Sequence, residues 1–310
     1  MIYAELEDEA LDLEVEDSVD PVAARVLAPT VRAIDAKPRW NPSLRTEAEY
    51  ADSLWRGFVA FLRYCASHGA SPQLVDATAI LGTYAYASAR AMVTGVLNRS
   101  SRTWREAARR SGRTDKLYNA LRTELEPGSY VGERYHQLVE SNSRLISTFP
   151  TEVAARLSTS AAFLQRTGGR SGQLAATDPD LLAAGRKHAR MVARTEVSKA
   201  SVALTRARSE EMDLPWYVWR DSEDQRVRPS HRLMNGVLVN WSDPPSPERL
   251  AGEKSILGTY NAGEAPNDRC YPEPLVSTKQ ISWPHKAYLG GRIQRVTLGQ
   301  FRAMNPTLGA

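Results

Sequence analysis

The pattern that most constrains the fold of this chain is a mostly apolar stripe with the period of an α-helix over residues 131–149. Its members lie at offsets 0, 3, 4, 7, 10, 11 and 14 from the first, and they are Tyr135, Leu138, Val139, Asn142, Leu145, Ile146 and Phe149. This spacing places all of them on one face of a helix. Pro150 fits the first turn of a following helix, so we expect a new helix to begin there.

Sequence patterns typical of helices extend well beyond this stripe and end before Pro215. We expect further helices over the ranges 46–68, 77–97, 100–112, 114–125, 150–166 and 178–212. After Pro215 the residues from Trp216 to Trp219 are aromatic and β-branched, which is typical of a strand, and 236–239 and 271–276 are two more strand candidates. The sequence predicts an α+β fold, with a mostly helical N-terminal half followed by a small C-terminal α+β domain with a short sheet.

Composition and turn residues divide the chain into four predicted parts. Residues 1–45 read as an acidic N-terminal arm and linker, 46–175 as a helical domain, and 176–280 as the α+β domain. Residues 281–310, which include Gly290 and Gly291, read as a C-terminal tail.

Charge is distributed unevenly along the chain. The net charge is +4, but the first 20 residues hold nine acidic residues and no Lys or Arg, which leaves 40 basic against 27 acidic residues in the remainder. A basic body is compatible with nucleic acid, and an acidic arm with a basic protein surface. The arm could equally be a solvated tail whose like charges prevent packing.

Several classes of protein are disfavoured by what the sequence lacks. No run reaches 18 apolar residues, so we expect no membrane span and no membrane partner. The acidic N-terminus has no apolar signal region. Cys65 and Cys270 are too few for a disulfide framework, which fits a reducing compartment.

A basic stripe is predicted on the helix that follows residue 100. Arg102, Arg105, Arg109 and Arg113 are spaced by 3, 4 and 4 positions and therefore share a face. Such a stripe could bind phosphates without reading sequence. The alternatives are a solvated face or a docking surface for an acidic protein.

The most specific signal joins three separate pieces of sequence. The first is Arg194-Thr195-Glu196 on the long helix over 178–212. The second is a charged turn followed by a glycine, and the third is the 267–270 segment Asn-Asp-Arg-Cys. The residues that we single out from the second and third pieces are Asp224, Arg226, Arg228, His231, Gly236 and Cys270.

This order of motifs resembles the phage head morphogenesis family typified by the Mu F protein. That family's pattern is A-R-T-E on a helix, then D-x-R-x-R-x-x-H and a glycine, then a proline-containing loop that ends in N-C-R-C. The resemblance covers roughly residues 130–280 and makes 176–280 the Mu F-like domain. One departure is Asp268, which stands where the family often has the first cysteine.

The resemblance implies a minor head (capsid) protein of a tailed bacteriophage that acts in head morphogenesis and is not an enzyme. Its expected partners are the portal protein and the major capsid or scaffold protein, with packaged double-stranded DNA as a further candidate. The expected location is the capsid interior at the portal vertex, after assembly in the host cytoplasm. No cofactor is implied.

The motif residues also suggest a role without the resemblance. Opposite charges on the helix and in the turn can form a partly buried network that fixes loop against helix. We therefore expect the helix at 194–196 to touch the turn at 224–231. Gly236 could supply a turn with positive φ that its β-branched and aromatic neighbours disfavour.

Two other functions stay open at this point. Glu196, Asp224 and His231 could serve as the acid–base set of an enzyme acting on nucleic acid or a nucleotide, although no phosphate-binding loop or nucleophile motif accompanies them. A toxin-like protein is the third alternative, because modules similar to this one occur joined to toxins, although no additional C-terminal enzyme domain is evident here.

Zinc is a metal that some of these motif residues could bind. His231, Asp268 and Cys270 are residue types that bind zinc, but structural zinc sites normally have four ligands and are richer in sulfur. With a single cysteine in this region, the sequence predicts no metal; a buried thiol beside a hydrogen-bonded histidine is the simpler expectation.

Overall fold

The structure is a computed structural model that describes residues 39–68, 75–111, 119–158, 179–223, 225 and 227–305. All of them belong to Pro38–Ala310, the second of the two units into which the chain divides. The acidic arm lies outside the described residues, and so do Arg113, Asp224 and Arg226.

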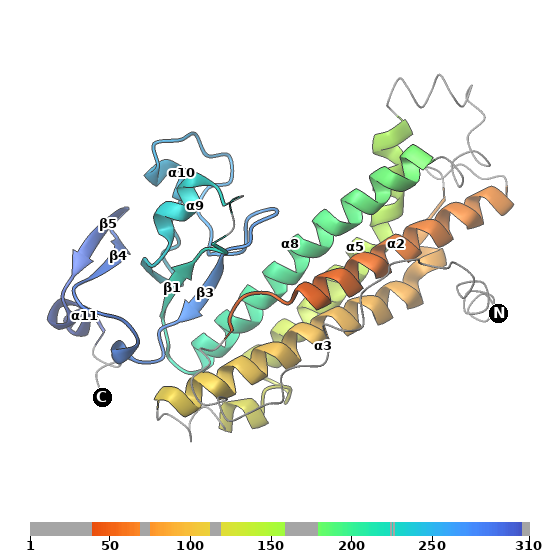
Figure 1. Ribbon diagram of the computed structural model, residues 1–310. Coiled ribbons are helices and arrows are strands. Elements are labelled where there is room, and N and C mark those ends of the chain that lie inside the picture. Colours follow the sequence, from red (N-terminus) through yellow and green to blue (C-terminus); the bar gives the residue numbers. More distant parts are fainter. Residues whose placement is uncertain are drawn as a thin grey trace, which may run out of the picture. The chain divides into compact units, whose positions relative to one another are not determined.

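Long helices that run side by side make up the N-terminal part of this unit (Figure 1). They are α2 (Leu44–Ser67), α3 (Ala77–Ser111), α5 (Tyr130–Ser158) and α8 (Pro179–Glu211). The first begins at an N-cap, because the Ser43 hydroxyl accepts a hydrogen bond from Thr46 N at 3.2 Å. Of the described helices, none combines the length and the apolar character needed to cross a membrane.

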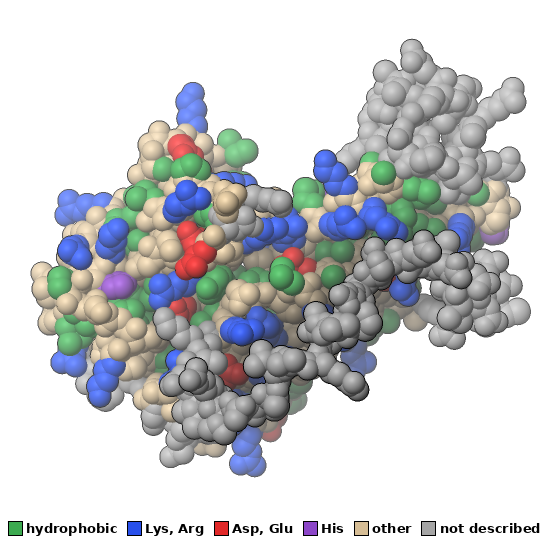
Figure 2. All heavy atoms as spheres, in the orientation of Figure 1, with side chains coloured by type: hydrophobic (Ala, Val, Ile, Leu, Met, Phe, Trp, Pro, Cys, Tyr) green, Lys and Arg blue, Asp and Glu red, His purple; other side chains and the backbone are tan. Residues whose placement is uncertain are grey.

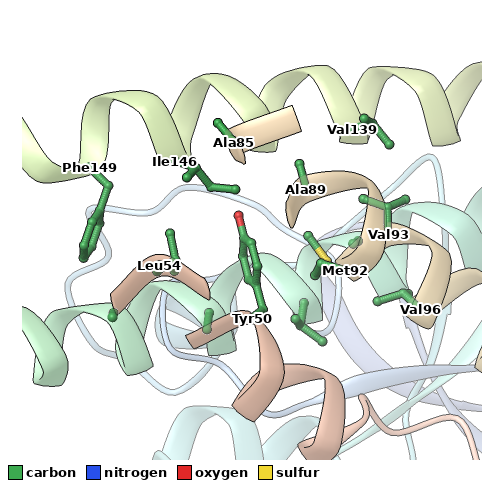
Figure 3. Packing of buried hydrophobic residues seen from close by; sticks show 14 of the residues in the cluster. Tyr50, Leu54, Ala85, Ala89, Met92, Val93, Val96, Val139, Ile146 and Phe149 are labelled. Atoms are coloured by element: carbon green, nitrogen blue, oxygen red, sulfur yellow. The ribbon is translucent and has the colours of Figure 1, made fainter. Parts of the chain in front are cut away.

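The helices share one hydrophobic core, to which the predicted stripe on α5 contributes Val139, Ile146 and Phe149. Figure 3 shows Tyr50 of α2 among these side chains, with its hydroxyl directed toward α5. There it donates a hydrogen bond to Asn142 Oδ1 at 2.9 Å. Asn142 is thus the one polar member of the stripe, and it is buried with its side-chain oxygen paired, as a buried amide requires.

Two predicted helix boundaries are wrong. The expected break before Ser100 does not occur, because Ser101 turns its hydroxyl back to Leu97 O at 2.9 Å and α3 continues through both serines. Likewise α5 passes through Pro150 without ending. Phe149 and Val153 are buried in the same core on either side of the proline, and this packing outweighs the lost backbone hydrogen bond.

A five-stranded mixed sheet follows the bundle, and the α+β prediction is confirmed. The strands are β1 (Trp216–Arg220), β2 (Leu238–Asn240), β3 (Tyr271–Pro274), β4 (His285–Leu289) and β5 (Arg292–Val296). Their order is β3-β1-β2-β4-β5; the β2–β4 pair is parallel and the other pairs are antiparallel. Short helices α9 (Pro229–Met234), α10 (Pro247–Leu250) and α11 (Leu298–Met304), with the 3₁₀ turn η1 (Thr278–Gln280), connect or flank the strands.

The expected C-terminal tail over 281–310 is wrong for its described part. Residues 285–296 form a β-hairpin, in which Gly290 and Gly291 make the turn with φ of +57° and +80°. The following helix α11 buries Phe301 completely. Asn305 then accepts a hydrogen bond from Trp216 Nε1 at 2.6 Å, which ties the end of the described chain to the first strand.

The bundle and the sheet are continuous with each other through α8. This helix packs in the bundle core and then leads after a short turn into β1. Beyond its midpoint Arg208, 1% exposed, forms an ion pair with Glu124 and hydrogen bonds with Ser101 on α3. A second core, which joins Trp104 of α3 to Val218 of β1, covers the junction. Although α8 lies wholly within the predicted part 176–280, it packs in one core with the helices of the part 46–175.

Candidate functional site

The three motif pieces meet around one loop, residues 261–270, which lies between α8 and α9. On the α8 side, Asn267 N donates to Thr195 Oγ1 at 3.0 Å, and Arg194 Nη1 donates to Asn267 Oδ1 at 2.8 Å. Asn267 adopts a φ of +58°, a left-handed conformation that asparagine tolerates better than most residues. The Arg-Thr pair of the helix thus holds the loop at a strained position.

The α9 side of the same loop is held by the second motif piece. His231 Nδ1 lies 3.1 Å from Asp268 Oδ1, and Arg228 Nη2 donates to Pro266 O at 3.4 Å. We expected the turn to touch the helix directly. The hydrogen bonds of His231 and Arg228 run instead to the loop, which α8 holds from its other side. Glu196 is paired with Lys199 of its own helix at 3.1 Å.

A buried polar cluster surrounds His231. On one side of the ring Nε2 lies 2.9 Å from Tyr260 Oη, and that hydroxyl donates to Glu248 Oε1 at 2.6 Å. On the other side Cys270 Sγ lies 3.3 Å from Nδ1, beside Asp268. His231 is 2%, Asp268 5% and Cys270 1% exposed, so the whole arrangement is shielded from solvent.

Backbone amides orient the Asp268 carboxylate. Cys270 N donates to Oδ1 at 2.9 Å and Gly263 N donates to Oδ2 at 3.0 Å. Gly263 has a φ of +87°, and an added Cβ would lie 2.7 Å from Cys270 O and 2.9 Å from Ser198 Oγ. A side chain at this position would therefore force apart the loop and α8, so only glycine allows this close approach.

The ionisation of the cluster follows from its burial and from its partners. Burial, reinforced by the negative charge of Asp268, raises the pKa of the Cys270 thiol. Burial alone would raise the pKa of Asp268, but the hydrogen bond and charge of His231 outweigh it, and the pKa is lowered. The pKa of Glu248 is lowered in the same way, with the Tyr260 hydroxyl as the main opposing influence.

This geometry does not assemble a nucleophile. A Cys–His–Asp triad needs the thiol and the carboxylate on opposite ring nitrogens, whereas Asp268 and Cys270 both face Nδ1 of His231. The raised thiol pKa also keeps Cys270 protonated near neutral pH. Of the alternative acid–base set, Glu196 and His231 have the separate partners described above, and Asp224 lies outside the described residues.

Gly236 lies at the turn between α9 and β2 and has a φ of +80°, the left-handed conformation expected from the sequence. Its amide donates to Trp219 O at 2.8 Å, and its carbonyl accepts from His285 Nε2 at 2.8 Å. The glycine thus links β1 to β4 across the intervening strand.

Three of the four stripe arginines lie in the described part of α3, and all three are exposed: Arg102, Arg105 and Arg109. The buried face of this part of the helix carries Trp104 and Ala108. Figure 2 shows basic side chains spread over the visible face of the molecule, with few acidic ones among them.

Sequence reasoning missed Tyr260 and Glu248, which complete the histidine's surroundings. Both come from the Pro- and Gly-rich stretch 242–269. Such a stretch has no hydrophobic period from which burial could be inferred, and a tyrosine or a glutamate in it gives no signal of its own. Only the packing of this stretch against α9 brings them to His231.

Comparison with known proteins agrees with the motif order. Residues 121–271 match the model of the family described as Phage Mu protein F like protein. A protein of Haemophilus influenzae is 28% identical over 150 residues, which is 48% of this chain and 31% of that relative, so the match spans about a third of the relative's length. No solved structure gives a significant match. The match over residues 121–271 thus supports the resemblance of this chain to the phage Mu protein F like family.

Proposed function

We propose that this protein is a minor head protein of a tailed bacteriophage, which acts in head morphogenesis as a structural component at the portal vertex. Its partners would be the portal protein and the major capsid or scaffold protein. The family match supports the head-morphogenesis role.

The structural role is supported by the contacts that the motif residues make. Arg194 and Thr195 hold the 261–270 loop from one side, and His231 holds it from the other. His231 is buried and the other two side chains are partly buried, so together they fix α8, the loop and α9 in one arrangement. A shape of this kind can present fixed surfaces to neighbouring subunits.

A second element of the proposal is sequence-independent contact with packaged DNA. The exposed arginines of α3 share one helix face and could neutralise phosphates without contacting bases. The excess of basic over acidic residues outside the first 20 positions supports the same contact. The acidic arm would bind a basic surface of a neighbouring head protein.

The test is incorporation into particles. Heads are purified from cells that produce the phage with wild-type protein, with Glu196→Gln or with Asp224→Asn, and the copies per portal ring are counted by quantitative mass spectrometry beside infectivity. Glu210→Gln, an exposed change on the same helix as Glu196, is the control. We expect infectivity to follow incorporation. Normal incorporation of stable variants with complete loss of infectivity would favour an enzyme instead.

A further inference from the structure

The hydrogen atoms around His231 can be assigned from its partners. The Tyr260 hydroxyl has a single proton, and that proton is directed to Glu248 Oε1 at 2.6 Å. The phenol oxygen is left as an acceptor toward His231 Nε2 at 2.9 Å. The ring therefore carries a hydrogen on Nε2, and in the neutral imidazole Nδ1 presents a lone pair.

Two further atoms of metal-binding type lie beside that nitrogen. Asp268 Oδ1 lies 3.1 Å from Nδ1 and Cys270 Sγ lies 3.3 Å from it. The Cys270 thiol can supply one proton to the space among the three atoms. That proton can join two of the three atoms but not all of them, whereas a cation that displaces it can be bound by all three.

The separations suit coordination by a single small cation. Zinc bonds of about 2.0–2.3 Å at tetrahedral angles place two ligand atoms about 3.3–3.6 Å apart. The separations of Nδ1 from Oδ1 and from Sγ lie within a few tenths of an ångström of that range, and all three ligand atoms lie within 4.8 Å of one another. Nitrogen, carboxylate oxygen and sulfur are the ligand types that zinc accepts.

We propose that His231 Nδ1, Asp268 Oδ1 and Cys270 Sγ bind a divalent transition-metal cation, with zinc as the preferred ion. A single cysteine argues against zinc in the sequence, but the convergence of three buried ligand atoms argues more strongly for it. A water molecule would complete the tetrahedron. The proposal does not depend on the role of the protein in the phage head.

The residues around the three ligand atoms orient them by hydrogen bonds, as in known metal sites. A metal-bound histidine usually donates its other N–H to a fixed acceptor, and here His231 Nε2 meets Tyr260, which is held by Glu248. The second oxygen of Asp268 is fixed by Gly263 N. Both arrangements orient a ligand before a cation arrives.

The cation would act as a clamp and would not turn over substrate. It would join α9 to the residues that lead into β3, two segments 37–39 positions apart in the chain. All three ligands are at most 5% exposed, which leaves no route for a substrate. Because the thiol loses its proton to solvent when the sulfur binds the metal, affinity should fall at acidic pH.

The experiment uses the full chain, purified and then stripped with a chelator. Zinc is added back, and bound metal is measured by elemental analysis after gel filtration, beside the melting temperature. Cobalt in place of zinc gives a second readout, because a thiolate ligand produces a near-ultraviolet charge-transfer band. Cys270→Ser is compared with Cys65→Ser, a buried cysteine on α2 that lies in a separate hydrophobic cluster.

We expect wild type and Cys65→Ser to bind about one zinc per chain, to melt at a higher temperature with zinc, and to show the cobalt band. Cys270→Ser should lose the band. Tyr260→Phe should keep the band but bind about 10–100-fold more weakly. If Cys270→Ser does not fold, the wild-type measurements decide: no retained zinc and no shift in melting temperature would overturn the proposal, as would a band that disappears with Cys65→Ser.

Discussion

Thr195 Oγ1 accepts a hydrogen bond from the backbone amide of Asn267 at 3.0 Å, so a helix residue supports a loop residue with positive φ that is 72 positions away in the chain. This is a point at which the bundle holds the loop that carries Asp268 and Cys270. Its strength can be measured without touching the buried cluster.

Replacing Thr195 by valine should destabilise the protein by about 0.5–1.5 kcal/mol, because the Asn267 amide loses its acceptor while side-chain volume is preserved. The measurement is the urea midpoint at constant slope. Thr195→Ser keeps the hydroxyl and is the matched control. A valine variant as stable as the serine variant would show that the bond contributes nothing.

The buried ion pair between Arg208 and Glu124 should behave non-additively. Arg208→Met alone leaves Glu124, whose side chain is 14% exposed, without its charge partner and should cost about 3–5 kcal/mol. The double variant with Glu124→Leu should be more stable than Arg208→Met, because no uncompensated charge remains. A double-mutant cycle in urea checks this, and simple additivity of the two losses would contradict it.

Glu248 should make the protein sensitive to acid. Its pKa is lowered in the folded state, because the Tyr260 hydrogen bond and the other bonds to its carboxylate outweigh the upward effect of burial. A group whose folded pKa is depressed contributes stability above its ordinary value of 4.5, and that stability is lost as the pH falls through the folded pKa.

Glu248→Gln should therefore lower the melting temperature at pH 7 and approach wild type as the pH falls below 4.5 and through the lowered pKa of Glu248. Melting curves across this range provide the measurement, with Glu253→Gln, an exposed glutamate of the following loop, as control. A difference between wild type and Glu248→Gln that stays constant with pH would rule out ionisation of this carboxyl as the cause.

Binding of double-stranded DNA should be sequence-blind and should weaken steeply with salt. Changing Arg102, Arg105 and Arg109 to alanine should lower the slope of log affinity against log salt by about one for each phosphate that the protein no longer neutralises. Alanine at Arg186, Lys187 and Arg190, exposed on α8, removes the same charge elsewhere and is the control. Equal losses from both triple variants would mean that general charge, and not the α3 face, attracts DNA.

Hydrophobic period was the best guide to this fold. The stripe from Tyr135 to Phe149 predicted the core face of α5, and the aromatic and β-branched run from Trp216 predicted β1, because each signal lies within a single element. Residue type alone gave a wrong helix boundary where tertiary contacts determine the structure. Ser100 suggested the start of a helix, yet it accepts a hydrogen bond from Arg208 inside a continuous α3.

The candidate site could be predicted only in part. The motif residues Arg194, Thr195 and His231 were identified from their order in the sequence, but not the loop through which they act together. That loop, and the parallel pairing of Leu238 with Ala287, bring together residues that are far apart in the chain. Contacts of this kind leave no periodic trace.

The parallel pairing of β2 with β4 has a practical consequence for anyone who isolates the family region. The matched segment ends at residue 271, the first residue of β3, whereas the sheet continues to Val296 and Trp216 hydrogen-bonds to Asn305. A fragment cut at the limits of the match would expose the open edge of β2 and the buried faces of Trp216 and Val218, which invites aggregation. The boundary of the sequence similarity is therefore not the boundary of the folding unit.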